Sequence, residues 1–246
     1  MRYFIIICMY LILSGMVSGC RKDNSTHNND RVTPNSFLSG NKYEKLTVEI
    51  QYVNGYQPTS ATLDNLKALL EQRLNKPGGI IIIQDAIPSP GKSAYSIDDI
   101  RNIEKTNRTQ NTKRNLLTAY FFFADNDYAV NSGSSKVLGI AYGNSSMVVF
   151  EKTIKDFAGG ITQPPITVLE TTVLEHEFGH LIGLVNNGSS MQSPHQDEPH
   201  GKHCDDKNCL MYYLAETSDI VTNLVGGNIP SLDAKCLVDL RANGGK

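Results

Sequence analysis

The segment 167–185 restricts the fold of this chain more than any other, because it combines two apolar stripes at helical spacing with the pentapeptide HEFGH at 176–180. Apolar residues on both stripes predict a helix buried on most of its surface, since a peripheral helix carries only one such stripe. Thr167-x-x-Glu170 has the spacing of a capping box and predicts that the helix starts there. We therefore expect a central helix.

Two histidines and a glutamate on that helix predict a metal site. Buried imidazoles and carboxylates are costly unless they are paired or coordinated. His176 and His180 lie one turn apart on one face, so both rings can reach a single zinc ion at about 2.1 Å. Glu177 is offset around the helix, where it can accept a proton from a water on the metal. The pattern predicts zinc-dependent hydrolysis of an amide bond. A chance HExxH on a surface helix is the alternative, and the apolar surroundings argue against it.

The longer stretch HEFGHLIG at 176–183 resembles the signature of the metzincin zinc peptidases, HExxHxxGxxH followed by a Met-turn. In that family the glycine lets the chain turn sharply toward a third ligand, and Gly183 suits the same turn because it lacks a Cβ. The residue at the family's third-ligand position is Asn186, and a neutral amide is a poor zinc ligand. The third ligand is therefore expected further along the chain.

The stretch HCDDKNCLMY at 203–212 resembles the archaemetzincin continuation, in which the third histidine is followed by cysteine, four residues, cysteine, one residue and methionine. The resemblance implies that His203 is the third ligand and that the additional residues after Asn186 form an inserted loop. Such an insertion is tolerable because loop-closure entropy grows only logarithmically with length. His195, His200 and Asn186 are the alternatives.

The same resemblance implies roles for residues after the third histidine. Met211 would be the Met-turn residue, an apolar floor beneath the metal, and an ordinary core methionine is the alternative. Tyr213, at Met-x-Tyr, occupies the position at which astacin-like and serralysin-like enzymes keep a tyrosine that can stabilise the oxyanion. A core or surface tyrosine is the alternative.

Three cysteines follow the central helix. Archaemetzincins carry a second, structural zinc bound by the cysteine pair and a later CxxC, but here the later pair is reduced to Cys236, so four thiolates are not available. Outside the cytoplasm Cys204 and Cys209, or one of them with Cys236, could form a disulfide, and a metal site is the other possibility.

Upstream segments predict an α+β fold, metzincin-like, with a mixed twisted sheet, packed helices and a small C-terminal subdomain. The expected order is a strand at 46–52, a helix at 63–74, a strand at 80–83, a helix capped by Ser96, and strands at 119–124, 137–142 and 147–150. Strand 137–142 corresponds to the metzincin edge strand that binds extended substrate by strand addition, although any half-buried strand would read the same way.

The N-terminus predicts export. A basic start and a short apolar run over 4–13 are typical of a signal peptide, and the ending Val-Ser-Gly-Cys20 resembles the lipobox of bacterial lipoproteins. We expect a signal peptide at 1–19, a lipidated Cys20, a flexible tether at 20–43, and a catalytic domain at 44–246 divided into subdomains at 44–184 and 185–246.

These features together predict a monomeric zinc metallopeptidase in the bacterial cell envelope, anchored to the membrane by lipid on Cys20 and acting on peptides or proteins. The balance of 23 basic and 25 acidic residues gives no electrostatic reason for a nucleic-acid partner. The alternatives are a non-catalytic binding lipoprotein with the same fold and an amidase of cell-wall peptides. Glu177 favours an enzyme, because a binding protein needs no buried carboxylate beside the metal.

Overall fold

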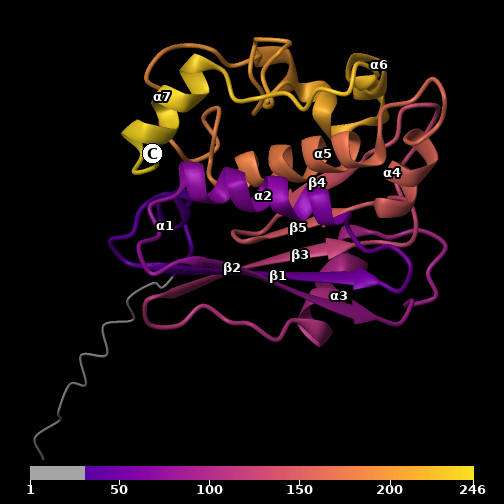
Figure 1. Cartoon of the computed structure of the whole chain (residues 1–246), viewed down its shortest axis with the longest axis horizontal. Helices are drawn as coiled ribbons and strands as arrows, with labels where there is room; N and C mark the ends of the chain where they lie inside the picture. The colour runs from indigo at the N-terminus through magenta and orange to yellow at the C-terminus, as the bar shows by residue number, and fades with distance from the viewer. Residues whose placement is uncertain (1–30) are drawn as a thin grey trace, which may run out of the picture. The chain divides into compact units, whose positions relative to one another are not determined.

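The structure, a computed structural model, describes residues 31–246, and these contain one mixed sheet of five strands (Figure 1). In spatial order the strands are β2 (Ile80–Ile87), β1 (Lys45–Val53), β3 (Leu116–Phe123), β5 (Ser146–Val149) and β4 (Gly139–Tyr142). The first four are parallel, and β4 pairs antiparallel with β5 at one edge. The strand predicted at 137–142 is therefore an edge strand.

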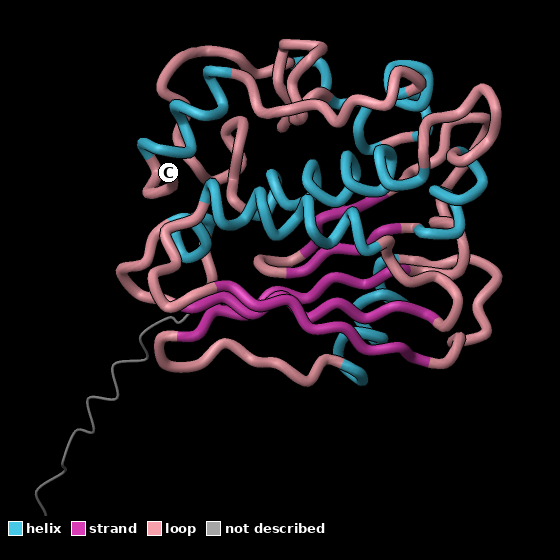
Figure 2. The backbone as a smooth tube through the Cα atoms, in the orientation of Figure 1, coloured by secondary structure: helices cyan, strands magenta, loops and turns pink. Residues whose placement is uncertain are grey.

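Helices cover both faces of the sheet (Figure 2). The helices of the described residues are α1 (Pro34–Leu38), α2 (Ser60–Arg73), α3 (Ile97–Asn107), α4 (Glu151–Phe157), α5 (Ile166–Leu181), α6 (Val221–Leu224) and α7 (Ala234–Ala242), of which α6 and α7 lie beyond α5 (Figure 1). Alternation along β3 divides the core: Phe121 and Phe123 belong to the apolar cluster under α2 and α5, and Tyr120 and Phe122 to the cluster that includes α3. The α+β class and the predicted order of strands and helices are confirmed. None of the helices within 31–246 combines the length and apolarity that a membrane span requires.

Helix α5 is the central helix predicted from the sequence, with thirteen of its sixteen residues buried. The predicted capping box is wrong. The helix begins one residue earlier, with Pro165 at the N-cap and no side-chain cap. Glu170 is fully buried and accepts hydrogen bonds of 2.9 Å from the backbone amide and the hydroxyl of Thr59, ahead of α2. The Glu170 carboxylate therefore bonds to Thr59, which is distant in the sequence, and not to the backbone at the start of α5.

The predicted tether extends too far toward the C-terminus, because residues 31–43 belong to the folded unit. Phe37 is fully buried with its ring edge-on to Phe178 at 5.7 Å. The buried ammonium of Lys76 donates to the carbonyls of Ser36, Ser39 and Tyr43 at 2.7, 2.6 and 2.7 Å. The polar composition of the segment concealed these long-range contacts. The signal peptide, Cys20 and the remaining part of the tether lie outside the described residues.

Candidate metal centre

Three imidazoles converge beside α5. His176 and His180 come from consecutive turns of this helix, and their Nε2 atoms lie 3.1 Å apart. His203 comes from the loop that follows, and its ring stacks on that of His176 with 5.3 Å between centroids. One nitrogen from each ring and a carboxylate oxygen of Glu216 all lie within 4.8 Å of one another. Ligands at about 2.1 Å from a tetrahedral ion are about 3.4 Å apart, so this group can hold one metal ion.

Hydrogen bonds at the far side of two rings prepare the imidazoles for coordination. Nδ1–H of His176 donates to the carbonyl of Leu210, and Nδ1–H of His203 donates to the carbonyl of His200, each at 2.7 Å. Both Nε2 atoms therefore keep a free lone pair that points into the cluster. Burial also lowers the pKa of His180 to about 4, which keeps this ring in the neutral form that binds metals. The donor set thus fits a divalent ion of the zinc type.

Glu177 lies between the histidines and the edge strand. Its Oε2 accepts a hydrogen bond of 2.6 Å from the backbone amide of Ala141 on β4, and its Oε1 has no hydrogen-bond partner within residues 31–246. Burial, and secondly the charge of Glu216, raise the pKa of this carboxyl well above its usual range. The hydrogen bond to β4 orients the side chain and leaves one oxygen available as a proton acceptor.

Glu216 is the residue of this cluster that sequence reasoning missed. It ends the short 3-10 helix η2 (Tyr213–Glu216), and its Oε1 lies 3.1 Å from Nε2 of His180 and 3.0 Å from Nε2 of His203. Nothing in its spacing from the HExxH helix distinguishes it from other surface carboxylates of the chain. Only the path of the loop after Met211 brings it to the histidines.

A cavity of about 620 Å³ opens onto the metal cluster and onto the edge strand. Its walls include residues 139–141 of β4 together with Glu177, His180, His203 and Glu216. A molecule bound in this cavity would therefore contact the backbone of β4 and the three-histidine cluster at once.

The turn after α5 follows the expectation for Gly183, which has a φ of 78°. A Cβ at this position would lie 2.6 Å from the backbone nitrogen of Ser189, so a side chain would be excluded even without backbone strain. Asn186 is not in the metal cluster, because its amide donates to Gln196 at 3.3 Å.

Met211 lies directly against α5, fully buried, at the position expected of a Met-turn residue. A Cβ added to Gly179, between the two helix histidines, would lie 2.2 Å from the Met211 sulfur and 3.0 Å from its terminal methyl. The absence of a side chain at position 179 therefore allows Met211 to pack closely against α5 between the two helix histidines.

We expect Gly179→Ala to lower the free energy of unfolding by up to about 2 kcal/mol, since overpacking costs about 1–3 kcal/mol and the gain in helix propensity offsets about 1 kcal/mol of it. Denaturant unfolding of the variant measures this loss. The double variant Gly179→Ala/Met211→Ala should be more stable than the sum of the two single changes predicts, because the smaller residue admits the new methyl. Additive losses would show that the two residues do not compete for space.

The structure gives other partners to two further candidates. His200 is exposed and pairs with Asp197 at 2.7 Å, so it is not a member of the metal cluster. Tyr213 stacks on the ring of His200 with 3.6 Å between centroids and does not line the cavity. A role for this tyrosine at the oxyanion stays a prediction without geometric support.

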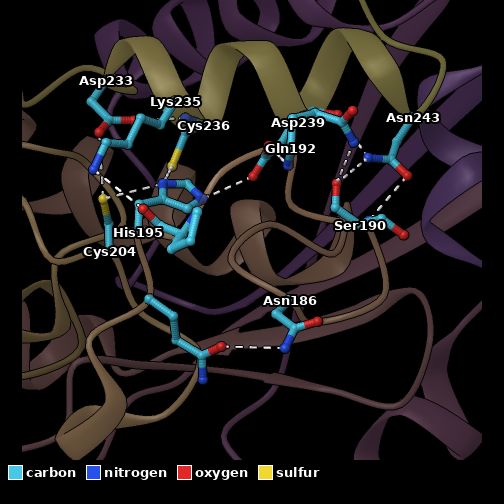
Figure 3. Close-up of polar contacts among 12 residues, drawn as sticks. Asn186, Ser190, Gln192, His195, Cys204, Asp233, Lys235, Cys236, Asp239 and Asn243 are labelled. Atoms are coloured by element: carbon cyan, nitrogen blue, oxygen red, sulfur yellow. Dashed lines mark hydrogen bonds and ion pairs between the residues drawn. The ribbon is translucent and has the colours of Figure 1, made fainter.

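His195, the remaining alternative for the third ligand, belongs to a second cluster under α7 (Figure 3). Its Nε2–H donates to Oδ2 of the buried Asp239 at 2.8 Å, so Nδ1 keeps the free lone pair. This Nδ1 lies 3.8 Å from the sulfur of Cys204 and 3.9 Å from that of Cys236. The two clusters thus use opposite ring nitrogens, each selected by the hydrogen bond that the other nitrogen makes.

All three cysteines of the folded unit are buried and reduced, and they meet at this second cluster. The sulfurs of Cys209 and Cys236 are 3.7 Å apart, too far for a disulfide of about 2.05 Å but close to the spacing of about 3.8 Å between two thiolates on one tetrahedral zinc. The Cys209 sulfur also accepts backbone N–H groups of Met211 and Asp233, both at 3.4 Å.

The side chains that can hold a metal ion here are His195, Cys204, Asp233 and Cys236, whose ligand atoms lie within 4.8 Å of one another, and the Cys209 sulfur lies beside them, next to Cys236. Oδ2 of Asp233 lies 3.5 Å from the Cys204 sulfur, and its other oxygen caps α7 through the amide of Cys236. The disulfide considered from the sequence is absent from residues 31–246.

No protein-family model and no curated protein matches this sequence. Among solved structures, the chain is similar to archaemetzincin from Methanopyrus kandleri, with a TM-score of 0.52 and 17% identity over 81% of this chain and 96% of that one. It is also similar to a zinc-dependent peptidase from Methanocorpusculum labreanum, with a TM-score of 0.46 and 16% identity over 78% and 99% of the two chains. The first of these likenesses shows that the chain shares the fold of that archaemetzincin over 81% of its length.

Proposed function

We propose that this protein is a zinc-dependent metallopeptidase. The observation that carries the proposal is the convergence of three imidazole nitrogens next to a buried glutamate that faces the same cavity. His176, His180 and His203 would hold the zinc ion. The ion would supply a Lewis acid and lower the pKa of a water in its open position toward neutrality.

Glu177 is the general base in this proposal. Its Oε2 is fixed by Ala141, so the unpartnered Oε1 is the atom that takes the proton of the attacking water. The same carboxyl then returns the proton to the leaving amine.

The substrate is proposed to be an extended peptide. The strand β4 lies at the edge of the sheet and lines the cavity, so its backbone groups other than the Ala141 amide, which Glu177 holds, are placed to pair with an added strand. Such pairing would place a peptide carbonyl next to the histidine cluster and Glu177. A cell-wall peptide amidase would use the same chemistry, and a binding protein would not need the unpartnered oxygen of Glu177.

The second cluster is proposed to hold a structural zinc. It is closed and buried, has thiolate and imidazole donors, and lies away from the cavity, as is typical of structural sites. We further propose that the chain is carried outside the cytoplasm on a lipid at Cys20, on the strength of the lipobox-like ending Val-Ser-Gly-Cys.

Metal analysis of single variants tests this assignment. We expect about two zinc ions per chain, one in each cluster. His203→Ala should lose about one ion together with peptide hydrolysis, because two imidazoles alone hold zinc weakly. The matched control is His200→Ala, which removes a nearby histidine outside both clusters and should retain both ions. Full zinc content and activity in His203→Ala would refute the three-histidine site.

A further inference from the structure

The side chain of Glu216 occupies the fourth corner of the histidine cluster. We propose that Glu216 is a fourth protein ligand, through Oε1, of the metal ion held by His176, His180 and His203. The inference rests on the proposed function only for the presence of that ion. Oε1 lies 3.8, 3.1 and 3.0 Å from the three Nε2 atoms in that order, which brackets the separation of about 3.4 Å for tetrahedral ligands.

The contact between Glu216 and His203 is typical of two ligands of one metal ion and not of a hydrogen bond. Nε2 of His203 is buried and lies 3.0 Å from Oε1, yet it makes no hydrogen bond. Two ligand atoms of one ion each point at the ion, so they lie close together although neither points at the other. Within residues 31–246, the described polar contacts of the Glu216 carboxylate are those with the three imidazoles.

The backbone holds Glu216 at this corner independently of its side chain. Its carbonyl accepts a hydrogen bond of 2.8 Å from the amide of Leu138, just before β4, and the amide of Ser218 donates to the carbonyl of Lys136 at 2.8 Å. Thr217 forms a bridge with Val137 between these two bonds. The segment that leads into the edge strand therefore fixes the position from which the carboxylate reaches the cluster.

A site with four protein ligands is closed, whereas a catalytic zinc site keeps one position for water. Coordination by Glu216 would thus give a resting form of the enzyme, in which the carboxylate occupies the position of the water. The side chain is 37% exposed at the cavity, so a rotation about its own torsions can release the metal toward solvent without breaking the backbone bonds to 136–138. Water from the cavity, which Glu177 also lines, would then take the vacated position.

Cobalt substitution of the full chain tests the inference without any assay of hydrolysis. Tetrahedral Co²⁺ absorbs in the visible, and binding of azide to an open position changes this spectrum. We expect Glu216→Ala to bind azide at least about tenfold more tightly than the wild type, because a position is vacated. Competition with a chelator should show at least about tenfold weaker zinc binding at this site, since even outer-shell partners contribute about 10–100-fold. Glu216→Gln, which keeps the size of the side chain, should behave like Glu216→Ala.

Asp219→Asn is the matched control, because it removes an exposed carboxylate of the same segment that accepts a hydrogen bond from Ser135, and it should leave both measurements unchanged. The cysteine cluster contributes a constant background to every azide difference spectrum. Equal azide and zinc affinities in wild type, Glu216→Ala and Glu216→Gln would overturn the fourth-ligand assignment. Wild-type protein that binds no cobalt at the three histidines would instead overturn the proposed metal centre, and the fourth ligand with it.

Discussion

Replacing Glu177 by glutamine is expected to lower the rate of peptide hydrolysis by about 10²–10⁴-fold while both zinc ions stay bound. The amide keeps the shape of the side chain but cannot accept the proton of the attacking water. Because Oε2 is held by Ala141 and Oε1 has no partner, the substitution changes proton transfer and little else in the packing. The measurement is kcat/KM on an unstructured peptide library together with zinc content.

Glu175→Gln is the matched control on the same helix. Glu175 is also buried, with a pKa raised by burial to about 7, but it faces the pocket formed with Arg73 and Leu69, away from the histidines. This variant should keep its activity. An active Glu177→Gln enzyme would remove the residue from the mechanism, and equal losses in both variants would indicate a general effect of carboxylate removal on the helix.

The second large effect is expected at the cysteine cluster. In a His203→Ala background, which lacks the three-histidine site, zinc should raise the free energy of unfolding by about 4 kcal/mol when free zinc exceeds its Kd about a thousandfold. Adding Cys204→Ser should abolish most of this gain, because a hydroxyl is a poor substitute for a thiolate ligand. Denaturant unfolding with and without zinc measures both quantities.

The metal-free proteins provide the control for this comparison. Cys204→Ser differs from the wild-type residue by one atom, so the two metal-free chains should unfold at similar denaturant concentrations. His200→Ala in the same background should retain the full zinc effect. A zinc-induced gain that survives Cys204→Ser would exclude the cluster as a structural metal site, and a large loss already without zinc would assign the effect to packing.

The conformation of the residues after α5 could be predicted from the sequence only in part. His203 was favoured over His195 from the resemblance to archaemetzincins, and the structure places His203 with the two helix histidines. The sequence motif did not predict which residues His195 contacts. Its place depends on Asp239 of α7, more than forty residues away, and on the sulfurs of Cys204 and Cys236, which come from two different segments.

The sequence by itself determined those features that rest on local spacing. A period of four residues places His176 and His180 on one helix face, and alternation or apolar runs marked the strands, because backbone geometry converts short spacings directly into directions in space. Only the tertiary structure decided that Glu216 joins the histidines and that residues 31–43 pack against the domain. Such contacts depend on how segments that are separated by loops pack together. A loop has no regular spacing of residues, so its sequence does not predict which segments it brings into contact.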